Sequence, residues 1–198
     1  MSLKRKSCAR CLRPNITCIC HLISAVDTDI EVLILQHPLE VTETKGTARL
    51  LHLCLPNSEL LIGEVFDTDI LASAKQSFLL YPITAEDHSL GIAAPPELNK
   101  SPSTDLTNTR LIIIDGTWRK SRKILCKNPH LQTVPRLVLE DLPASAYTIR
   151  KARKPHQLST LEATCAALAQ LERNTQKFAP IMQSFTAFNL FISNQWRI

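Results

Sequence analysis

Apolar residues fall into five short runs along the chain, at 31–36, 59–65, 77–81, 110–115 and 136–140. Each run is nearly continuous and does not alternate with polar residues, which is typical of strands in a sheet that is covered on both faces. The run "RLIIID" stops abruptly in Asp115. The pattern therefore predicts five buried strands, one of which ends in a carboxylate.

Helical periodicity separates these runs. It predicts a helix over about 46–55 that stops at Pro56-Asn57, a helix that starts at Trp118, and a last helix over 179–195. Ser159 followed three residues later by Glu162 forms a capping-box signature at the start of a further helix, which the Ala/Leu pattern continues to about residue 174. A short helix is expected at 73–77 and a long surface loop at 84–109. Strands that alternate with helices predict an α/β domain with a mainly parallel sheet and helices on both faces.

Composition limits the classes of protein that remain. The 198 residues, of which 44% are hydrophobic, suit one sizeable globular domain. No apolar run approaches the roughly 20 residues that a membrane helix needs. The start "MSLKRKSCARC" is basic but has no hydrophobic region after it, so we do not expect a secretory signal and we predict a cytoplasmic protein without a membrane partner.

Positive charge is concentrated in two segments. Residues 1–24 hold five Lys/Arg and no acid, residues 115–155 hold ten Lys/Arg against three acids, and the rest of the chain is acidic, so that the net charge is +5. Two basic segments on an acidic body favour a polyanion-binding surface, and the alternative is a solvated charged face.

Four cysteines near the N-terminus, Cys8, Cys11, Cys18 and Cys20, have the spacing CxxC, six residues, CxC. Four thiolates on two tight turns can close a tetrahedral Zn²⁺ site, which would be saturated and therefore structural. His21 follows Cys20 directly and is an alternative ligand. Cys54, Cys126 and Cys165 stand among apolar neighbours, and we expect each to be a buried small hydrophobe.

Asp115 is the candidate for chemistry, because a strand that ends in this residue would place it at the carboxyl edge of the sheet, where open α/β folds bind ligands. Gly116 would allow a sharp turn and Thr117 would cap the helix that follows. The alternative is a capping carboxylate or an ion pair with Arg119. Phosphatases of the haloacid-dehalogenase type need a nucleophilic aspartate two residues earlier, where this chain has Ile113, so that interpretation is excluded.

The segment 145–163 is the third feature. Its cations precede the predicted helix start at Ser159, where backbone N–H groups could hold a carboxylate or a phosphate. His156 is either catalytic or simply exposed.

Five blocks together resemble the DTW-domain family. They are the N-terminal CxRC…CxC, "QHPLEVTETKGTARLL" (36–51), "LYP" (80–82), "IIIDGTWRKSRKI" (112–124) and "YTIRKARKPHQLSTLEA" (147–163), in the order of the family and over nearly the whole chain. Asp115-Gly116-Thr117-Trp118 matches the usual Asp-x-Thr-Trp core.

The resemblance implies an enzyme that transfers the 3-amino-3-carboxypropyl group of S-adenosylmethionine to N3 of a uridine in tRNA, at a variable-loop position, and releases methylthioadenosine. It also implies a fold related to the knotted SPOUT methyltransferases, with a four-cysteine zinc module at 1–25 and the catalytic domain at 26–198. We expect a monomer, because the N-terminal module sets the chain apart from the dimeric knotted enzymes.

The resemblance also implies roles for individual residues. Asp115 would be the general base, and Trp118 would either stack on a nucleobase or pack beneath the site. The residues expected to bind the cofactor are Leu80, Tyr81, Pro82, Ile114, Thr117, Ser159, Thr160 and Glu162. The cations expected to hold tRNA phosphates are Arg119, Lys120, Arg122, Lys123, Arg150, Lys151, Arg153 and Lys154.

The sequence is compatible with two other functions. One is a zinc-containing RNA-binding adaptor without catalytic activity, which would bind tRNA but not S-adenosylmethionine. The other is an S-adenosylmethionine-dependent RNA methyltransferase.

Overall fold

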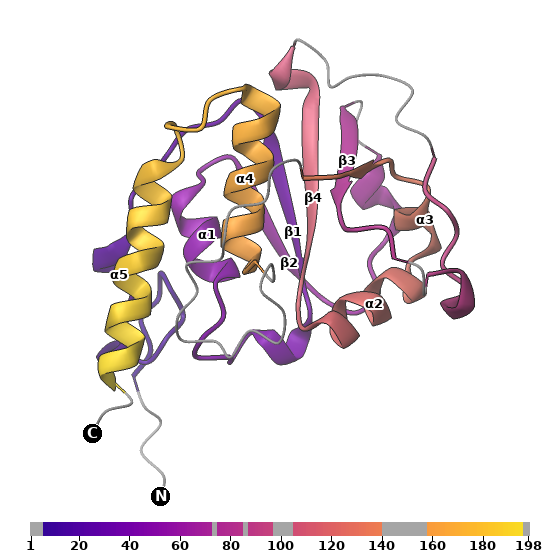
Figure 1. The fold of residues 1–198 in the computed structure, drawn as a ribbon. Coiled ribbons are helices and arrows are strands. Elements are labelled where there is room, and N and C mark those ends of the chain that lie inside the picture. The colour runs from indigo at the N-terminus through magenta and orange to yellow at the C-terminus, as the bar shows by residue number, and fades with distance from the viewer. Residues whose placement is uncertain (1–5, 73–74, 85–86, 97–104, 140–157, 196–198) are drawn as a thin grey trace, which may run out of the picture.

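A computed structural model describes residues 6–72, 75–84, 87–96, 105–139 and 158–195 of the chain (Figure 1). The strands are β1 (Glu31–Gln36), β2 (Ser58–Ile62), β3 (Gln76–Leu80), β4 (Thr109–Asp115) and β5 (Arg136–Leu137). The helices are α1 (Ala48–Cys54), α2 (Trp118–Lys127), α3 (Pro129–Gln132), α4 (Thr160–Glu172) and α5 (Ala179–Gln195).

The strands form one parallel sheet in the order β2-β1-β4-β3-β5. The central pair is β1 and β4, in a register that places Gln36 opposite Asp115 at the carboxyl end. The chain moves outward from β1 to β2 on one side and returns to β3 and β4 on the other. The order of strands therefore reverses between β1 and β4, which is where open α/β sheets form ligand-binding crevices.

Helices cover both faces of the sheet, as the continuous apolar runs predict (Figure 1). Alternate residues of β4 face opposite sides: Leu111 and Ile113 pack in the core beneath α1, α4 and α5, whereas Ile112 and Ile114 pack beneath α2 and α3. The mainly parallel α/β architecture is thus confirmed. In the described part of the chain, no helix is long and apolar enough to cross a membrane.

The N-terminal segment packs into the larger of these two cores. It consists of turns and two short 3₁₀ helices, Asn15–Thr17 and Cys20–Leu22. Cys11 and Ile19 are almost fully buried in the same core as residues of α5. The division of the chain at residue 25 stays a prediction.

Several details differ from the sequence-based expectations. β2 ends at Ile62 because its partner β1 ends at Gln36, whose carbonyl accepts the last bond from the N–H of Gly63. The short helix expected at 73–77 is wrong for Gln76 and Ser77, which begin β3. Cys54 and Cys165 are buried, but Cys126 lies on the exposed side of α2.

The start of α4 carries the predicted capping box. The Ser159 hydroxyl accepts a hydrogen bond from the N–H of Glu162 (3.2 Å), and the Glu162 carboxylate accepts one from the N–H of Ser159 (2.7 Å). Thr117 occupies the N-cap position of α2, but its side chain makes no capping hydrogen bond. The two helix starts therefore form a matched pair with and without a side-chain cap.

We expect Ser159→Ala to lower the free energy of unfolding by about 1 kcal/mol, because it leaves a buried helix N–H without its acceptor. Thr117→Ala should cost clearly less, since no capping bond is lost. Urea unfolding followed by circular dichroism measures both. Equal losses would show that the cap at Ser159 does not stabilise α4.

Candidate functional site

Asp115 is held from two sides at the carboxyl end of β4. Its Oδ2 accepts a hydrogen bond from Nε2 of Gln36 at 2.9 Å, and its Oδ1 accepts one from the Thr160 hydroxyl at 2.6 Å. The backbone carbonyl of Asp115 also accepts a bond from the N–H of His37. Only 5% of Asp115 is exposed. The carboxylate thus links the end of β1, the end of β4 and the start of α4 in a fixed orientation.

An apolar cavity of about 370 Å³ lies beside this carboxylate. Six residues that the sequence assigns to cofactor binding line it: Leu80, Tyr81, Pro82, Ile114, Ser159 and Thr160. Leu137 of β5, with Val138 and Leu139 after it, completes the apolar wall. The volume falls within the range of about 300–1,000 Å³ that is usual for small-molecule sites.

A smaller and more polar cavity of about 240 Å³ contains Asp115 itself. It shares Gly116, Ser159 and Thr160 with the apolar cavity, so these three small residues form the boundary between the two. Thr117 lines this polar cavity. Glu162 lines neither cavity as described, because its carboxylate is engaged with the N–H of Ser159.

Gly116 is required for close packing at this boundary. A Cβ atom at this position would lie 3.1 Å from Cβ of Lys120. The backbone of Gly116 is not in the left-handed region, which among the described glycines only Gly91 adopts. The absence of a side chain therefore lets α2 start directly against the strand end, and the turn itself does not depend on a special conformation.

Trp118 stacks on Tyr81 at the rim of the apolar cavity. The two ring centroids are 5.3 Å apart and the ring planes differ by 7°. The guanidinium of Arg122 lies 4.8 Å from the centroid of the Trp118 ring, which is still 39% exposed. Burial raises the pKa of the Tyr81 hydroxyl, so the Tyr81 side chain stays neutral. Trp118 is thus part of the cavity wall and also reaches the surface.

Two of the predicted phosphate-binding cations on α2 are already in ion pairs. Lys120 contacts Glu40 at 2.8 Å, and Lys123 contacts Glu64 at 2.7 Å. Arg119 is exposed. Arg150, Lys151, Arg153 and Lys154, together with His156, lie outside the described residues.

Glu64 is the centre of a charged cluster that the sequence does not reveal. Its carboxylate contacts Lys123, Lys127 (2.6 Å) and Nε2 of the buried His37 (2.9 Å). Nδ1 of His37 accepts a hydrogen bond from the N–H of Leu39. Hydrogen bonds from Lys123 and Lys127 lower the pKa of Glu64 to about 2. Through these contacts, Glu64 connects the loop after β2 to α2 and to the residue that follows β1.

The four N-terminal cysteines converge as their spacing predicts. All four sulfur atoms lie within 4.8 Å of one another, with Cys8 and Cys20 at 3.6 Å and Cys11 and Cys18 at 3.7 Å. Zn–S bonds of about 2.3 Å in a tetrahedron separate the sulfur atoms by about 3.8 Å. The arrangement therefore fits a tetrahedral metal site. The His21 ring packs edge-on against Phe191 and is not part of this group.

The thiols of this cluster differ in acidity. Backbone N–H groups of Cys11 and Arg10 lower the pKa of Cys8 to about 6, whereas burial and the neighbouring thiols raise the pKa of Cys20 to about 12. Ionisation is therefore favoured at Cys8 and opposed at Cys20. A bound cation would offset the repulsion among the remaining sulfur atoms.

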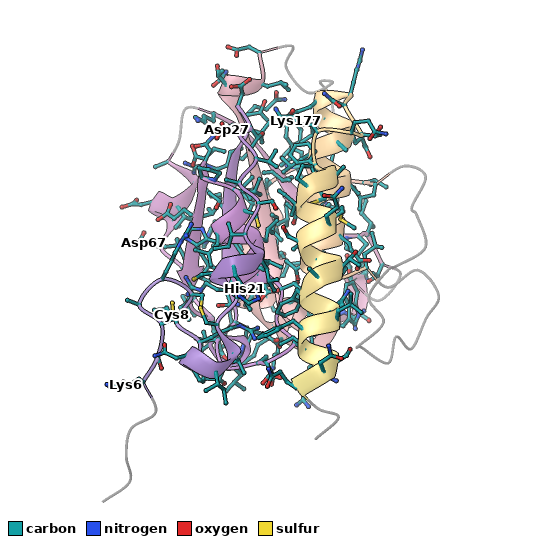
Figure 2. All side chains as sticks on the ribbon, turned by 90° about the vertical axis from the view of Figure 1, so that its left-hand side faces the viewer. Lys6, Cys8, His21, Asp27, Asp67 and Lys177 are labelled. Carbon is teal, nitrogen blue, oxygen red and sulfur yellow. The ribbon has the colours of Figure 1, made fainter. Side chains whose placement is uncertain are left out.

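Arg13, between the two cysteine pairs, connects this cluster to the loop beside Asp115. Its guanidinium donates to the carbonyl oxygens of Thr44 (2.7 Å) and Gly46 (3.4 Å) and lies over the Phe188 ring of α5. A third cavity, of about 470 Å³, opens between the cysteine segment (residues 8–20) and this loop. Its lining includes Gln36 and Arg49. Figure 2 shows Cys8 and Lys6 toward the lower end of the molecule, the end at which α2 starts in Figure 1.

The chain is similar to known proteins over most of its length. A model of the DTW domain matches residues 5–193. A protein of Macaca fascicularis named tRNA-uridine aminocarboxypropyltransferase 2 is 34% identical over 183 residues, which cover 86% of this chain and 58% of that protein. A Drosophila melanogaster protein of the same name is 31% identical over 188 residues, which cover 85% of this chain and 68% of that protein.

The mouse protein of this name is 33% identical over 183 residues and is also matched over 58% of its length. The chain thus spans somewhat more than half the length of the mammalian relatives. No solved structure matches it significantly.

The cluster around Glu64 predicts a dependence of stability on pH. The folded-state pKa of about 2 lies below the ordinary value of 4.5, so the stabilisation is complete above pH 4.5 and is lost as the pH falls toward 2. We expect the difference in the free energy of unfolding between the wild type and Glu64→Gln to shrink over this interval. Urea unfolding at a series of pH values measures it, and a difference that stays constant down to pH 2 would contradict the assignment.

Proposed function

Because this chain belongs to the DTW domain family, we propose that it is a tRNA-uridine aminocarboxypropyltransferase. It would transfer the 3-amino-3-carboxypropyl group of S-adenosylmethionine to N3 of a uridine in the variable loop of tRNA and release methylthioadenosine. The observation that carries the proposal is the position of Asp115. Its carboxylate is clamped at the centre of the carboxyl edge and is separated from an apolar cavity only by Gly116, Ser159 and Thr160.

In this proposal the adenosine part of the donor occupies the apolar cavity. Its lining combines aliphatic side chains with the stacked Tyr81 and Trp118, which suits an adenine ring. The amino-acid part of the donor crosses the boundary of small residues toward the polar cavity. The carbon that leaves sulfur would then lie beside Asp115 and not beside the apolar wall.

Asp115 would act as the general base. The carboxylate accepts the proton of uridine N3, N3 forms a bond to Cγ of the aminocarboxypropyl group, and the Cγ–S bond breaks. Its electron pair returns to sulfur, so the positively charged sulfonium leaves as neutral methylthioadenosine. The choice of Cγ over the methyl carbon depends on which of them is held in line with N3, and is therefore a matter of positioning.

Gln36 and Thr160 would orient the carboxylate for this step. Each donates to one oxygen, which fixes the plane of the carboxylate, and a carboxylate oxygen has more than one lone pair with which to accept a further bond from the uridine. A buried carboxylate is held most firmly when both of its oxygens accept hydrogen bonds. An apolar residue in place of Gln36 or Thr160 would leave one oxygen of Asp115 without its donor. Glu162 and Thr117 would support the cofactor site from the helix starts rather than by lining the apolar cavity.

The four cysteines would hold a structural Zn²⁺, whose positive charge stabilises the thiolates. With four protein ligands the ion has no open position, so it would take no part in the reaction. Arg13 would hold the loop at residues 44–46 in place against the metal-bound segment, through its hydrogen bonds to the carbonyl oxygens of Thr44 and Gly46. The proposal also includes a SPOUT-related, knotted topology, which the doubly covered parallel sheet supports in its broad architecture.

The partners in this proposal are tRNA and S-adenosylmethionine, for a monomeric enzyme in the cytoplasm. Arg119 and the basic segment 150–154 would contact tRNA phosphates. Lys120, Arg122 and Lys123 would contribute mainly through the packing of α2, since Lys120 and Lys123 face carboxylates and Arg122 lies against Trp118.

The function is tested by incubating purified protein with unmodified tRNA and S-adenosylmethionine and analysing the nucleosides by mass spectrometry. We expect the wild type to form aminocarboxypropyluridine and Asp115→Asn to lose at least about 100-fold in rate, the usual effect of removing a general base. Asp67→Asn, a change of the same kind at an exposed aspartate, is the control and should keep full activity. An Asp115→Asn variant as active as this control would eliminate Asp115 as the base.

The same experiment separates the alternative functions. Methylated uridine in place of the larger product would indicate a methyltransferase. If no product forms, calorimetry with S-adenosylmethionine alone decides whether the protein is an RNA-binding adaptor, since the adaptor would bind tRNA but not the donor.

The metal site gives a second test. Elemental analysis of the native protein should find about one equivalent of zinc, and Cys11→Ser should lose it, because Cys11 is the most buried ligand. Cys126→Ser, at an exposed cysteine outside the cluster, should retain the metal. A native protein that is folded but contains no metal would contradict the zinc assignment.

A further inference from the structure

The ion pairs of the described residues divide the cations of this protein into two groups. Those along the outer side of α2 face carboxylates: Lys120 contacts Glu40, and both Lys123 and Lys127 contact Glu64. A cation that is already paired gains less from a phosphate, because the existing partner must be given up. The positive charge of α2, which the sequence predicts to bind tRNA phosphates, is therefore partly neutralised by these carboxylates.

The N-terminal part of the chain, around the cysteine segment, carries cations that are not in ion pairs within the described ranges. Lys6 and Arg10 are exposed and have no carboxylate partner within the described ranges. Residues 1–24 contain five Lys/Arg and no acidic residue. A Zn²⁺ ion with four thiolates would carry a charge of about −2, so the segment remains positive by about three charges when the metal is bound.

Residues that follow Arg10 directly line a cavity next to the Asp115 site. Leu12 and Arg13 of the cysteine segment line the cavity of about 470 Å³ together with Gln36, the hydrogen-bond partner of Asp115. Arg49, at the start of α1, is half-buried in the same lining and likewise has no carboxylate partner among the described residues. This cavity shares Glu40, Glu43 and Gly46 with the polar cavity that contains Asp115.

We propose that Lys6, Arg10 and Arg49 form an RNA-binding surface that holds the phosphate backbone next to the target uridine. This inference rests on the proposed function, and it assigns the cysteine segment a direct part in substrate binding besides its structural one. The exposed carboxylate of Glu43 lies at the junction of the cavities.

A control cation is available at the opposite end of the strands, far from the proposed RNA-binding surface. α4 begins beside Asp115 and its 13 residues extend for about 20 Å to Arg173. Arg173 is exposed and, like Arg10, has no carboxylate partner in the part of the chain that the structure describes. Figure 2 shows Lys177, four residues further on, at the end opposite Lys6 and Cys8.

The test is the affinity for unmodified tRNA, measured by fluorescence anisotropy over a series of salt concentrations. Arg10→Gln and Arg49→Gln should each raise Kd about five-fold at about 0.1 M salt and lower the slope of log K against log salt by about 0.8, the effect of one lost phosphate contact. Arg173→Gln removes the same charge and should change Kd less than about two-fold with an unchanged slope.

Equal effects of Arg10→Gln and Arg173→Gln would overturn the proposal, because only the net charge would then matter. Lys6→Gln, outside the cysteine pairs, repeats the test if Arg10→Gln loses its metal, and an affinity equal to that of Arg173→Gln would again refute it. A wild-type protein that binds no tRNA would instead refute the proposed function, so the two failures are distinguishable.

Discussion

The hydrogen bonds on the Asp115 carboxylate determine how the rest of the site is organised. A buried carboxylate is costly unless its oxygens are satisfied, and here the two donors come from different elements: Gln36 from the end of β1 and Thr160 from the start of α4. The strand order makes this possible, since β1 and β4 are neighbours whose ends are in register at Gln36 and Asp115. Loss of either donor would change the position of the group on which the proposed reaction depends.

Small residues separate the apolar cavity from the polar cavity that contains this carboxylate. Gly116, Ser159 and Thr160 line both the apolar and the polar cavity, and a larger side chain at any of them would separate the two. The capping box at Ser159 uses its hydroxyl and its N–H within α4, so the residue shapes the boundary while its polar groups are satisfied locally. The same residues thus stabilise a helix start and form the boundary between the two cavities, across which the proposed donor and acceptor would meet.

Much of this arrangement could be predicted from local sequence patterns. The five apolar runs predicted the sheet, although β5 covers only the first two residues of the run at 136–140. The Ser159–Glu162 spacing predicted the start of α4, and the cysteine spacing predicted the converging thiols. Contacts between distant segments could not be predicted in this way. Gln36 as a partner of Asp115 depends on the order of the strands, and the pairing of Lys123 with Glu64 depends on where a loop after β2 crosses α2. The stacking of Trp118 on Tyr81 had a usable signal, since Tyr81 ends one predicted strand and Trp118 lies three residues after the end of another. Their distance in space did not follow from this signal.

The central claim is that the fold presents Cγ of the donor to Asp115 and directs the methyl group elsewhere. A crystal structure of the protein with S-adenosylmethionine tests it most directly. We expect the adenine in the cavity next to Tyr81 and Trp118, and Cγ of the methionine part closer than the methyl carbon to the Asp115 carboxylate. A complex in which the methyl carbon faces Asp115, or in which the adenine lies outside this cavity, would contradict the claim.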